Sequence, residues 1–337
     1  MKKKWRILFF AIGIVSIAFL VIRSKPSKKE WAEILQPKTL LFLLGMMLLW
    51  ALIYFVHEEA LRQVIGPESA AIRRISLYRI IVSGFALNNL TPVGLAGGEP
   101  YRIMELKPYL GLKKATSSTL NYSILFIIGH VLLWLTGILI YVLMGCPGET
   151  FLTVLLMIAA AVLLAAVLLF FLKRKGGLLM PALRFFGKIP FLRKPVGKML
   201  DKNGAHIEEI DQYYGEFKRA RRSFASSCVL EYLARILECA EYFLIFLFLG
   251  QKINIFGGIL ILSMASLVGN LFFMIPMQAG TREGGMVLAL GWLGIDPSAG
   301  VMGGLLYRVR DILGSLIGVL CILIEKKHEE KLEKRGI

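Results

Sequence analysis

Residues 92–99 read Pro-Val-Gly-Leu-Ala-Gly-Gly-Glu, and residues 276–283 read Pro-Met-Gln-Ala-Gly-Thr-Arg-Glu. In both stretches a glutamate follows a proline by seven positions, with glycine and alanine between them. Proline ends a helix because it lacks an amide N–H, and glycine permits a tight reversal of the chain. Each stretch therefore predicts the turn of a helical hairpin. The residues expected to form the two turns are Pro92, Gly94, Gly97, Gly98, Pro276 and Gly280.

The composition around these turns is that of a membrane protein. Of the 337 residues, 56% are hydrophobic and only 19% are charged, and the mean hydropathy is +0.66. Soluble domains carry about 25% charged residues, so the composition excludes a soluble globular enzyme. It also excludes a disordered chain, which would lack the apolar residues.

Six apolar runs approach the length of about 20 residues that a spanning helix needs. They are residues 5–22, 40–56, 115–143, 151–172, 228–249 and 299–324. The turns interrupt two further units, residues 75–112 and 255–295, which we predict to enter and leave the bilayer on one side. The predicted fold is a single all-α polytopic membrane domain over residues 1–337, with about six spans and two oppositely oriented re-entrant hairpins that form an inverted repeat.

The net charge of +17 indicates how the chain is oriented in the membrane rather than nucleic-acid binding. With two non-crossing hairpins, one side holds the N-terminus, the polar stretches 57–79 and 102–114, the segment 173–222 and the C-terminal tail, with 30 of the 40 Lys and Arg residues. The positive-inside rule makes that side cytoplasmic, together with both termini. The basic stretch 173–222 carries apolar residues among its charges and is predicted to be an amphipathic element on anionic lipid. Location in a bacterial cytoplasmic (inner) membrane is expected.

A glutamate, Glu99 or Glu283, begins the second helix of each hairpin. A helix N-terminus attracts anions through its free N–H groups and its dipole. Each glutamate is therefore either a structural cap or a titratable gate. Arg102 and Arg282 lie nearby in sequence, where they can pair with these acids or with a lipid phosphate.

Ionisable side chains within membrane spans are costly, and they indicate functional sites. One span carries Glu231, Arg235, Glu238 and Glu241 on roughly one helical face, with Glu231 and Arg235 spaced as an i,i+4 pair. The last span carries Arg308, Arg310 and Asp311, of which Arg308 and Asp311 share a face. Asn89 adds polarity at a similar depth. For each residue alone, a helix–helix hydrogen bond is the simpler interpretation.

Motifs of hydrolases, ATPases, Rossmann proteins and zinc enzymes do not occur in the sequence. The four cysteines are scattered and the four histidines have no metal-ligand spacing. We therefore expect no metal and no cofactor.

The hairpin motifs resemble those of the lysylphosphatidylglycerol synthase transmembrane-domain family, the flippase-like domain of multiple-peptide-resistance-factor proteins. Asn89-Leu90-Thr91-Pro92 with Gly98-Glu99-Pro100-Tyr101-Arg102 resembles its N-x-x-P…G-E-x-x-R element, Pro276 to Glu283 its second element, and Tyr307-Arg308 its late Tyr-Arg pair. Val93 and Met277 stand where the family often has glycine. The resemblance implies lipid translocation between leaflets, without aminoacylation by this chain.

The leading hypothesis is therefore a transporter, not an enzyme, that moves an anionic phospholipid or a polyprenyl-phosphate-type lipid between leaflets, passively or driven by protons or membrane potential. Its expected substrate-binding residues are Glu99, Arg102, Arg235, Arg282, Glu283 and Arg308, supported by Asn89, Glu238, Glu241 and Asp311. One alternative is a lipid-modifying transferase with Glu238 or Glu241 as base. The other is a structural or assembly partner of an envelope-biosynthesis enzyme; a homo-oligomer is a further option.

Overall fold

A computed structural model describes residues 36–90, 97–172, 221–271, 278, 280–296 and 298–334, with a few isolated residues between 173 and 220. The first predicted span (residues 5–22) and most of the basic segment 173–222 lie outside the described residues. So do three of the predicted turn residues, Pro92, Gly94 and Pro276.

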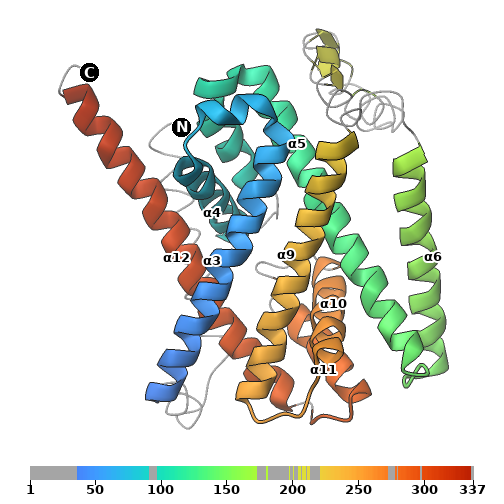
Figure 1. Cartoon of the computed structure of the whole chain (residues 1–337). Helices are drawn as coiled ribbons and strands as arrows, with labels where there is room; N and C mark the ends of the chain where they lie inside the picture. The colour runs from blue at the N-terminus through green and yellow to red at the C-terminus, as the bar shows by residue number, and fades with distance from the viewer. Residues whose placement is uncertain are drawn as a thin grey trace.

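Every element in the described part of the chain is a helix, which confirms the all-α prediction (Figure 1). In order they are α3 (Pro37–Ile65), η1 (Pro67–Ala71), α4 (Arg74–Leu90), α5 (Gly98–Leu143), α6 (Thr150–Leu172), α9 (Arg221–Phe248), α10 (Ile255–Leu271), α11 (Thr281–Trp292) and α12 (Ser298–Lys334). Among them, α3 and α5 are long and apolar enough to cross a bilayer. The number of spans stays a prediction.

The long helices run between two ends of the bundle (Figure 1). At one end lie the end of α3, η1, the start of α9 and the end of α12. At the other lie the starts of α3, α6 and α12 and the end of α9. The stretches 57–79 and 102–114, both predicted to be cytoplasmic, include residues at the first of these ends, which we call the basic end; the second is the opposite end.

Two pairs of consecutive helices, α4 with α5 and α10 with α11, pack against each other as the two arms of a hairpin would. α10 and α11 pack closely on each other, and α4 packs against α5 and α12. In Figure 1, α4 and the first part of α5 lie near the basic end, whereas α10 and α11 lie side by side nearer the opposite end. Whether either pair is re-entrant in a bilayer stays a prediction.

The helix α5 differs from the predicted boundaries. We expected a polar stretch up to residue 114 and a span from 115, but one helix covers Gly98–Leu143 with a break at Gly111, where φ is 72° and ψ is 162°. Glycine adopts this positive φ without a Cβ clash. Gly111 therefore lets the chain change direction between the hairpin and the span.

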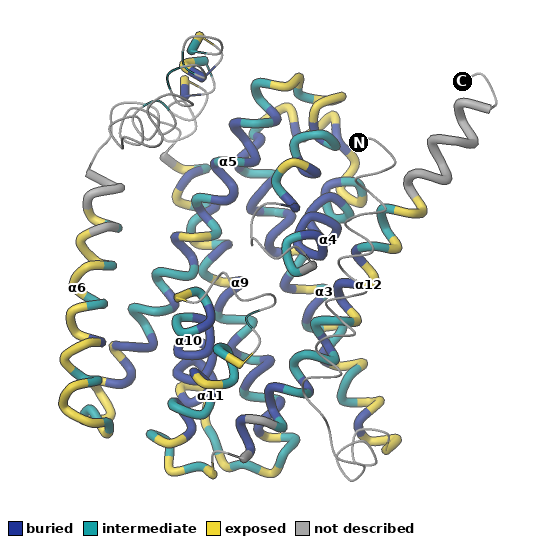
Figure 2. Tube along the Cα trace, turned by 180° about the vertical axis from the view of Figure 1, so that it is seen from behind, coloured by how far each residue is buried: buried dark blue, intermediate teal, exposed yellow. Residues whose placement is uncertain are grey.

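Each hairpin has its own apolar core. One cluster joins α3, α4 and the first half of α5 around Leu77, Ile81 and Leu106. The second joins α9, α10 and α11 around Leu260, Met264 and Leu290. Figure 2 shows that the outward face of α6 is largely exposed, which suits a helix whose apolar side chains meet lipid.

Salt bridges at the basic end connect α5 to its surroundings. Lys114 pairs with Glu68 of η1, and Lys113 pairs with Glu209. The hydrogen bond from Lys114 lowers the pKa of the Glu68 carboxyl, which lies outside the spanning helices. The Glu68 carboxyl is half-exposed, so this pair contributes little to stability.

Candidate functional site

Glu99 is the centre of a polar cluster in the first hairpin. Its Oε1 accepts hydrogen bonds from Arg102 Nη1 at 3.2 Å, Ser123 Oγ at 3.1 Å and Asn88 Nδ2 at 3.4 Å. Asn88 Oδ1 accepts the backbone N–H of Gly98 at 2.6 Å. Glu99 lies in the first turn of α5, where a carboxylate is favoured by the helix dipole. The predicted pairing of Glu99 with Arg102 is thus present.

Arg102 is a buried cation with free hydrogen-bonding capacity. Its relative exposure is 1%, and its Nε and Nη2 have no hydrogen-bond partner. The guanidinium carbon lies 4.6 Å from the centre of the Phe85 ring and 5.2 Å from that of Tyr122. These aromatic faces stabilise the charge in part, but the three N–H donors on Nε and Nη2 remain available.

Glu283 has different partners in the second hairpin. Its Oε2 accepts the backbone N–H of Gly280 at 2.8 Å, so it caps the helix α11 that it begins. Its Oε1 accepts Arg308 Nε at 2.5 Å, and Arg308 Nη2 completes the ion pair. The option that Glu283 pairs with its sequence neighbour Arg282 is not realised, because adjacent residues on a helix do not face each other.

Arg282 has no carboxylate partner among the described residues. Its guanidinium carbon lies 4.9 Å from the centre of the Tyr307 ring, and its buried Nε has no hydrogen-bond partner. Arg310 lies 5.4 Å from the same ring. Two guanidinium groups therefore contact the Tyr307 ring of α12.

A third cluster joins α3, α5 and α9 around Arg235. Its Nη1 donates to Glu238 Oε2 at 2.6 Å, and its Nη2 donates to His57 Nε2 at 2.7 Å. Because arginine can only donate, Nε2 of His57 is the acceptor, and Nδ1 donates to Glu231 Oε1 at 3.0 Å. Glu231 thus bonds His57, and the predicted i,i+4 pair with Arg235 is not formed.

Arg310 and Glu241 form the most deeply buried ion pair of the described residues, with side-chain exposures of 4% and 0%. Arg310 Nε and Nη2 both donate to Glu241 Oε1. Asp311 lies 3.6 Å from Arg310 Nη1 and accepts Asn89 Nδ2 at 3.1 Å. Asp311 and Arg308, predicted to share a face, therefore bond different partners, since Arg308 pairs with Glu283.

The predicted site residues thus fall into several clusters. Glu99 and Arg102 form one, Glu283 and Arg308 a second, and Arg235 and Glu238 a third. Glu241 and Asp311 join Arg310, and Arg282 contacts Tyr307. Of the turn residues, Gly97 and Gly98 are buried at the start of α5, and Gly280 precedes α11 with a positive φ of 85°.

Sequence reasoning missed some residues of these clusters. His57 was placed at the start of a polar cytoplasmic stretch, but α3 continues to Ile65 and buries His57 to 1% exposure. Glu58, fully buried with both oxygens unpartnered, was missed for the same reason. The signal lay in the apolar positions 60, 61, 64 and 65, which continue the helical period. In the described part of the chain, no group of His, Cys, Asp and Glu side chains is arranged to hold a metal ion.

The fold and these clusters define a helical membrane protein with ion pairs buried between its helices. The chain belongs to the lysylphosphatidylglycerol synthase TM region family, whose family model matches residues 7–318. The resemblance seen at the hairpin motifs is thereby confirmed, and it indicates a membrane location and a function related to membrane lipids. Comparisons with curated proteins and with solved structures gave no match.

Proposed function

We propose that this protein transports an anionic phospholipid or a polyprenyl-phosphate-type lipid between the leaflets of a bacterial cytoplasmic membrane. The observation that carries the proposal is a set of buried guanidinium groups with unused donors. Nε of Arg102, Arg235 and Arg282, and Nη2 of Arg102, are buried and bonded to no acceptor. A buried donor without an acceptor costs about 1–3 kcal/mol, and more on a charged group.

A phosphate headgroup is the ligand that these donors suit. Guanidinium groups bind phosphate oxygens through paired, charge-assisted hydrogen bonds. Arg102 belongs to the first turns of α5, and Arg282 to the first turn of α11. Each hairpin therefore brings a cation close to a helix N-terminus, and both features favour an anion.

The glutamates at these two helix starts are our candidates for proton coupling. Glu99 holds one oxygen, Oε2, that is buried and has no hydrogen-bond partner. Protonation of Glu99 or Glu283 would weaken its bond to Arg102 or Arg308 and leave that arginine free for a phosphate. In this scheme the basic end of the bundle and both chain termini face the cytoplasm.

Reconstitution tests the proposal. The purified chain is incorporated into phosphatidylcholine vesicles that contain fluorescent phosphatidylglycerol, and a membrane-impermeant reductant reports the labelled lipid in the outer leaflet. We expect transbilayer movement well above that of protein-free vesicles, reduced by Arg282→Gln and unchanged by Lys252→Gln, since Lys252 lies in the exposed α9–α10 connection. A wild-type rate equal to that of empty vesicles would refute transport.

Proton coupling has its own measurement. We expect the transport rate to vary with pH and Glu99→Gln to flatten that variation, since glutamine does not titrate. An unchanged pH profile in this variant would remove the coupling role of Glu99 while leaving transport itself intact.

The same vesicles distinguish transport from lipid chemistry. A transferase that used Glu238 or Glu241 as base would convert the lipid into a new species, whereas a transporter returns it unchanged. Mass spectrometry of the extracted lipids after incubation makes this distinction, and a new lipid species that Glu238→Gln abolishes would favour the enzyme.

A further inference from the structure

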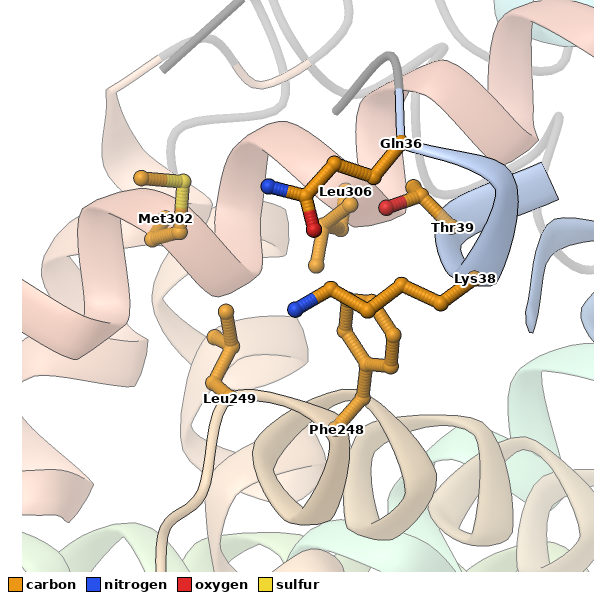
Figure 3. Close-up of a pocket in the computed structure, with 7 residues that line it drawn as sticks. All are labelled: Gln36, Lys38, Thr39, Phe248, Leu249, Met302 and Leu306. Carbon is orange, nitrogen blue, oxygen red and sulfur yellow. The ribbon is translucent and has the colours of Figure 1, made fainter. Parts of the chain in front are cut away.

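A cavity of about 290 Å³ lies toward the opposite end of the bundle, and Figure 3 shows its lining. It is an open pocket bordered by the start of α3, the end of α9 and the beginning of α12. Its lining residues are Gln36, Lys38, Thr39, Phe248, Leu249, Met302 and Leu306.

The lining has the chemistry of a site for an anionic amphiphile. Four lining residues are apolar, and Lys38 is the one charged side chain among the seven. In Figure 3 the Lys38 side chain passes the Phe248 ring, and its ammonium and the Gln36 amide are both directed toward the space beside Met302, Leu306 and Leu249. Lys38 forms no ion pair with any described residue, so its charge is available to a ligand.

The cavity also adjoins a surface suited to acyl chains. The first turns of α3 beyond Lys38 expose a row of leucines, with exposures of 49–74%. They are Leu40, Leu41, Leu44, Leu48 and Leu52. A ligand with a negative headgroup at Lys38 and an apolar tail along this row would match both surfaces, because exposed leucines of a membrane helix contact lipid.

The walls of the cavity continue toward the buried ion pairs. On α12, Met302, Leu306 and Arg310 recur at intervals of four, so they lie along one helical face. On α9, Ile245 and Glu241 are four residues apart, and Leu249 follows directly after the end of this helix. Between the cavity and the Arg310–Glu241 pair, the residues Met46, Ile245 and Leu306 form a small apolar cluster.

We propose that this cavity binds the phosphate headgroup of an anionic phospholipid, with Lys38 as its cation, at the opposite end of the bundle from the basic one. The inference rests on the proposed function, in which this cavity is the lipid-binding site at one end of the transport path. Gln36 donates a second hydrogen bond to the headgroup, and the apolar cluster separates this position from the buried arginines.

A photo-crosslinking residue at position 302 tests where the lipid binds. The full chain carrying this residue is purified in nanodiscs of phosphatidylcholine with phosphatidylglycerol, irradiated and analysed by mass spectrometry. We expect a phosphatidylglycerol adduct in excess of its share of the lipid. An adduct with residues 1–35 of the chain, or one that follows the lipid ratio, would overturn the proposal.

The second measurement compares phosphatidylglycerol binding before and after the charge of Lys38 is removed. Lys38→Gln should weaken phosphatidylglycerol binding about tenfold, the loss of one charge-assisted contact, and should lower the yield of the adduct at position 302. Lys252→Gln is the matched control, because Lys252 is an exposed cation at the same end of the bundle but does not line the cavity. Equal phosphatidylglycerol binding by the Lys38 variant and the control would refute the site.

The two proposals fail in different ways. Binding at Lys38 is measured at equilibrium and needs no transport, so a chain that moves no lipid but gives the adduct would refute only the proposed function. A chain that transports phosphatidylglycerol but gives no adduct would refute only this site.

Discussion

The two hairpins share a spacing in the sequence but differ in how their glutamates are bonded. Among the described residues, Glu99 bonds Asn88 of α4 and Arg102 and Ser123 of α5. Glu283 bonds the start of its own helix and Arg308 of α12. The carboxylate of the first hairpin therefore joins α4 to α5, whereas the carboxylate of the second joins α11 to α12.

The Arg102–Glu99 and Arg308–Glu283 pairs also differ in how far they are buried. The side-chain exposures are 1% for Arg102 and 12% for Glu99, against 14% for Arg308 and 18% for Glu283. A less buried pair loses less when it is broken. Of the two ion pairs, Glu283–Arg308 is thus the one whose separation costs less.

The largest expected effect is on stability when each glutamate loses its charge. Glu99→Gln leaves the Arg102 cation buried without a counter-charge, and we expect a loss of about 3–5 kcal/mol. Glu283→Gln removes a partly exposed pair, so a loss of about 1.5–3 kcal/mol is expected. The two variants are compared by thermal unfolding in detergent, where Glu99→Gln should show the lower Tm.

A second substitution shows whether the uncompensated charge is the cause. Adding Arg102→Met to Glu99→Gln removes the buried cation and should recover much of the lost Tm, because a neutral apolar side chain fills similar space. If the double variant is no more stable than Glu99→Gln, or if Glu283→Gln has the lower Tm, then the proposed difference between the hairpins is wrong.

An effect of intermediate size is expected from glycines at which the hairpin helices touch. A Cβ at Gly98 would lie 2.2 Å from Gly84 O, and one at Gly285 would lie 2.4 Å from Met264 O. Both contacts are with backbone, which cannot move aside locally. Gly98→Ala and Gly285→Ala should therefore each destabilise the protein by about 1–3 kcal/mol.

Gly284 offers the matched control for this pair of variants. It is the neighbour of Gly285 on α11, and a Cβ there would meet nothing within 4 Å. Gly284→Ala should leave Tm unchanged or raise it, because alanine is the better helix former by about 1 kcal/mol. Equal losses at Gly284 and Gly285 would show that close helix packing is not the cause.

The helical fold was predictable because apolar runs, prolines and glycines act locally. The all-α class followed from the sequence, and the predicted start of the second hairpin helix at Glu283 lies two residues after its observed start at Thr281. The sequence did not predict the continuity of α5 across Gly111 or the extension of α3 to Ile65. Both segments carry charged residues that are typical of loops, and their helical conformation is stabilised by packing against distant helices, which the sequence alone does not reveal.

The site shows the same division between local and long-range contacts. The Arg102–Glu99 pair is three residues apart, and its closeness in sequence was enough to suggest it. For Arg235 helical spacing suggested Glu231, but the arginine pairs with Glu238. The His57–Glu231 contact joins residues 174 positions apart, and Arg310–Glu241 joins residues 69 apart. Such pairs depend on which helices are neighbours, and composition and periodicity do not determine that.

The smallest expected effect concerns the helix starts of the two hairpins. The N–H of Gly98 donates to Asn88 of the preceding helix α4, whereas the N–H of Gly280 donates to Glu283 of the helix that follows it. Asn88→Ala should thus open the start of α5, with a loss of about 1 kcal/mol, as for other helix caps. Hydrogen exchange at residues 97–104 should become faster than in the unsubstituted protein. Asn89→Ala is the control because Asn89 bonds Asp311 of α12 instead; faster exchange at residues 97–104 in that variant as well would show that α4 acts on α5 through packing rather than through the Asn88 cap.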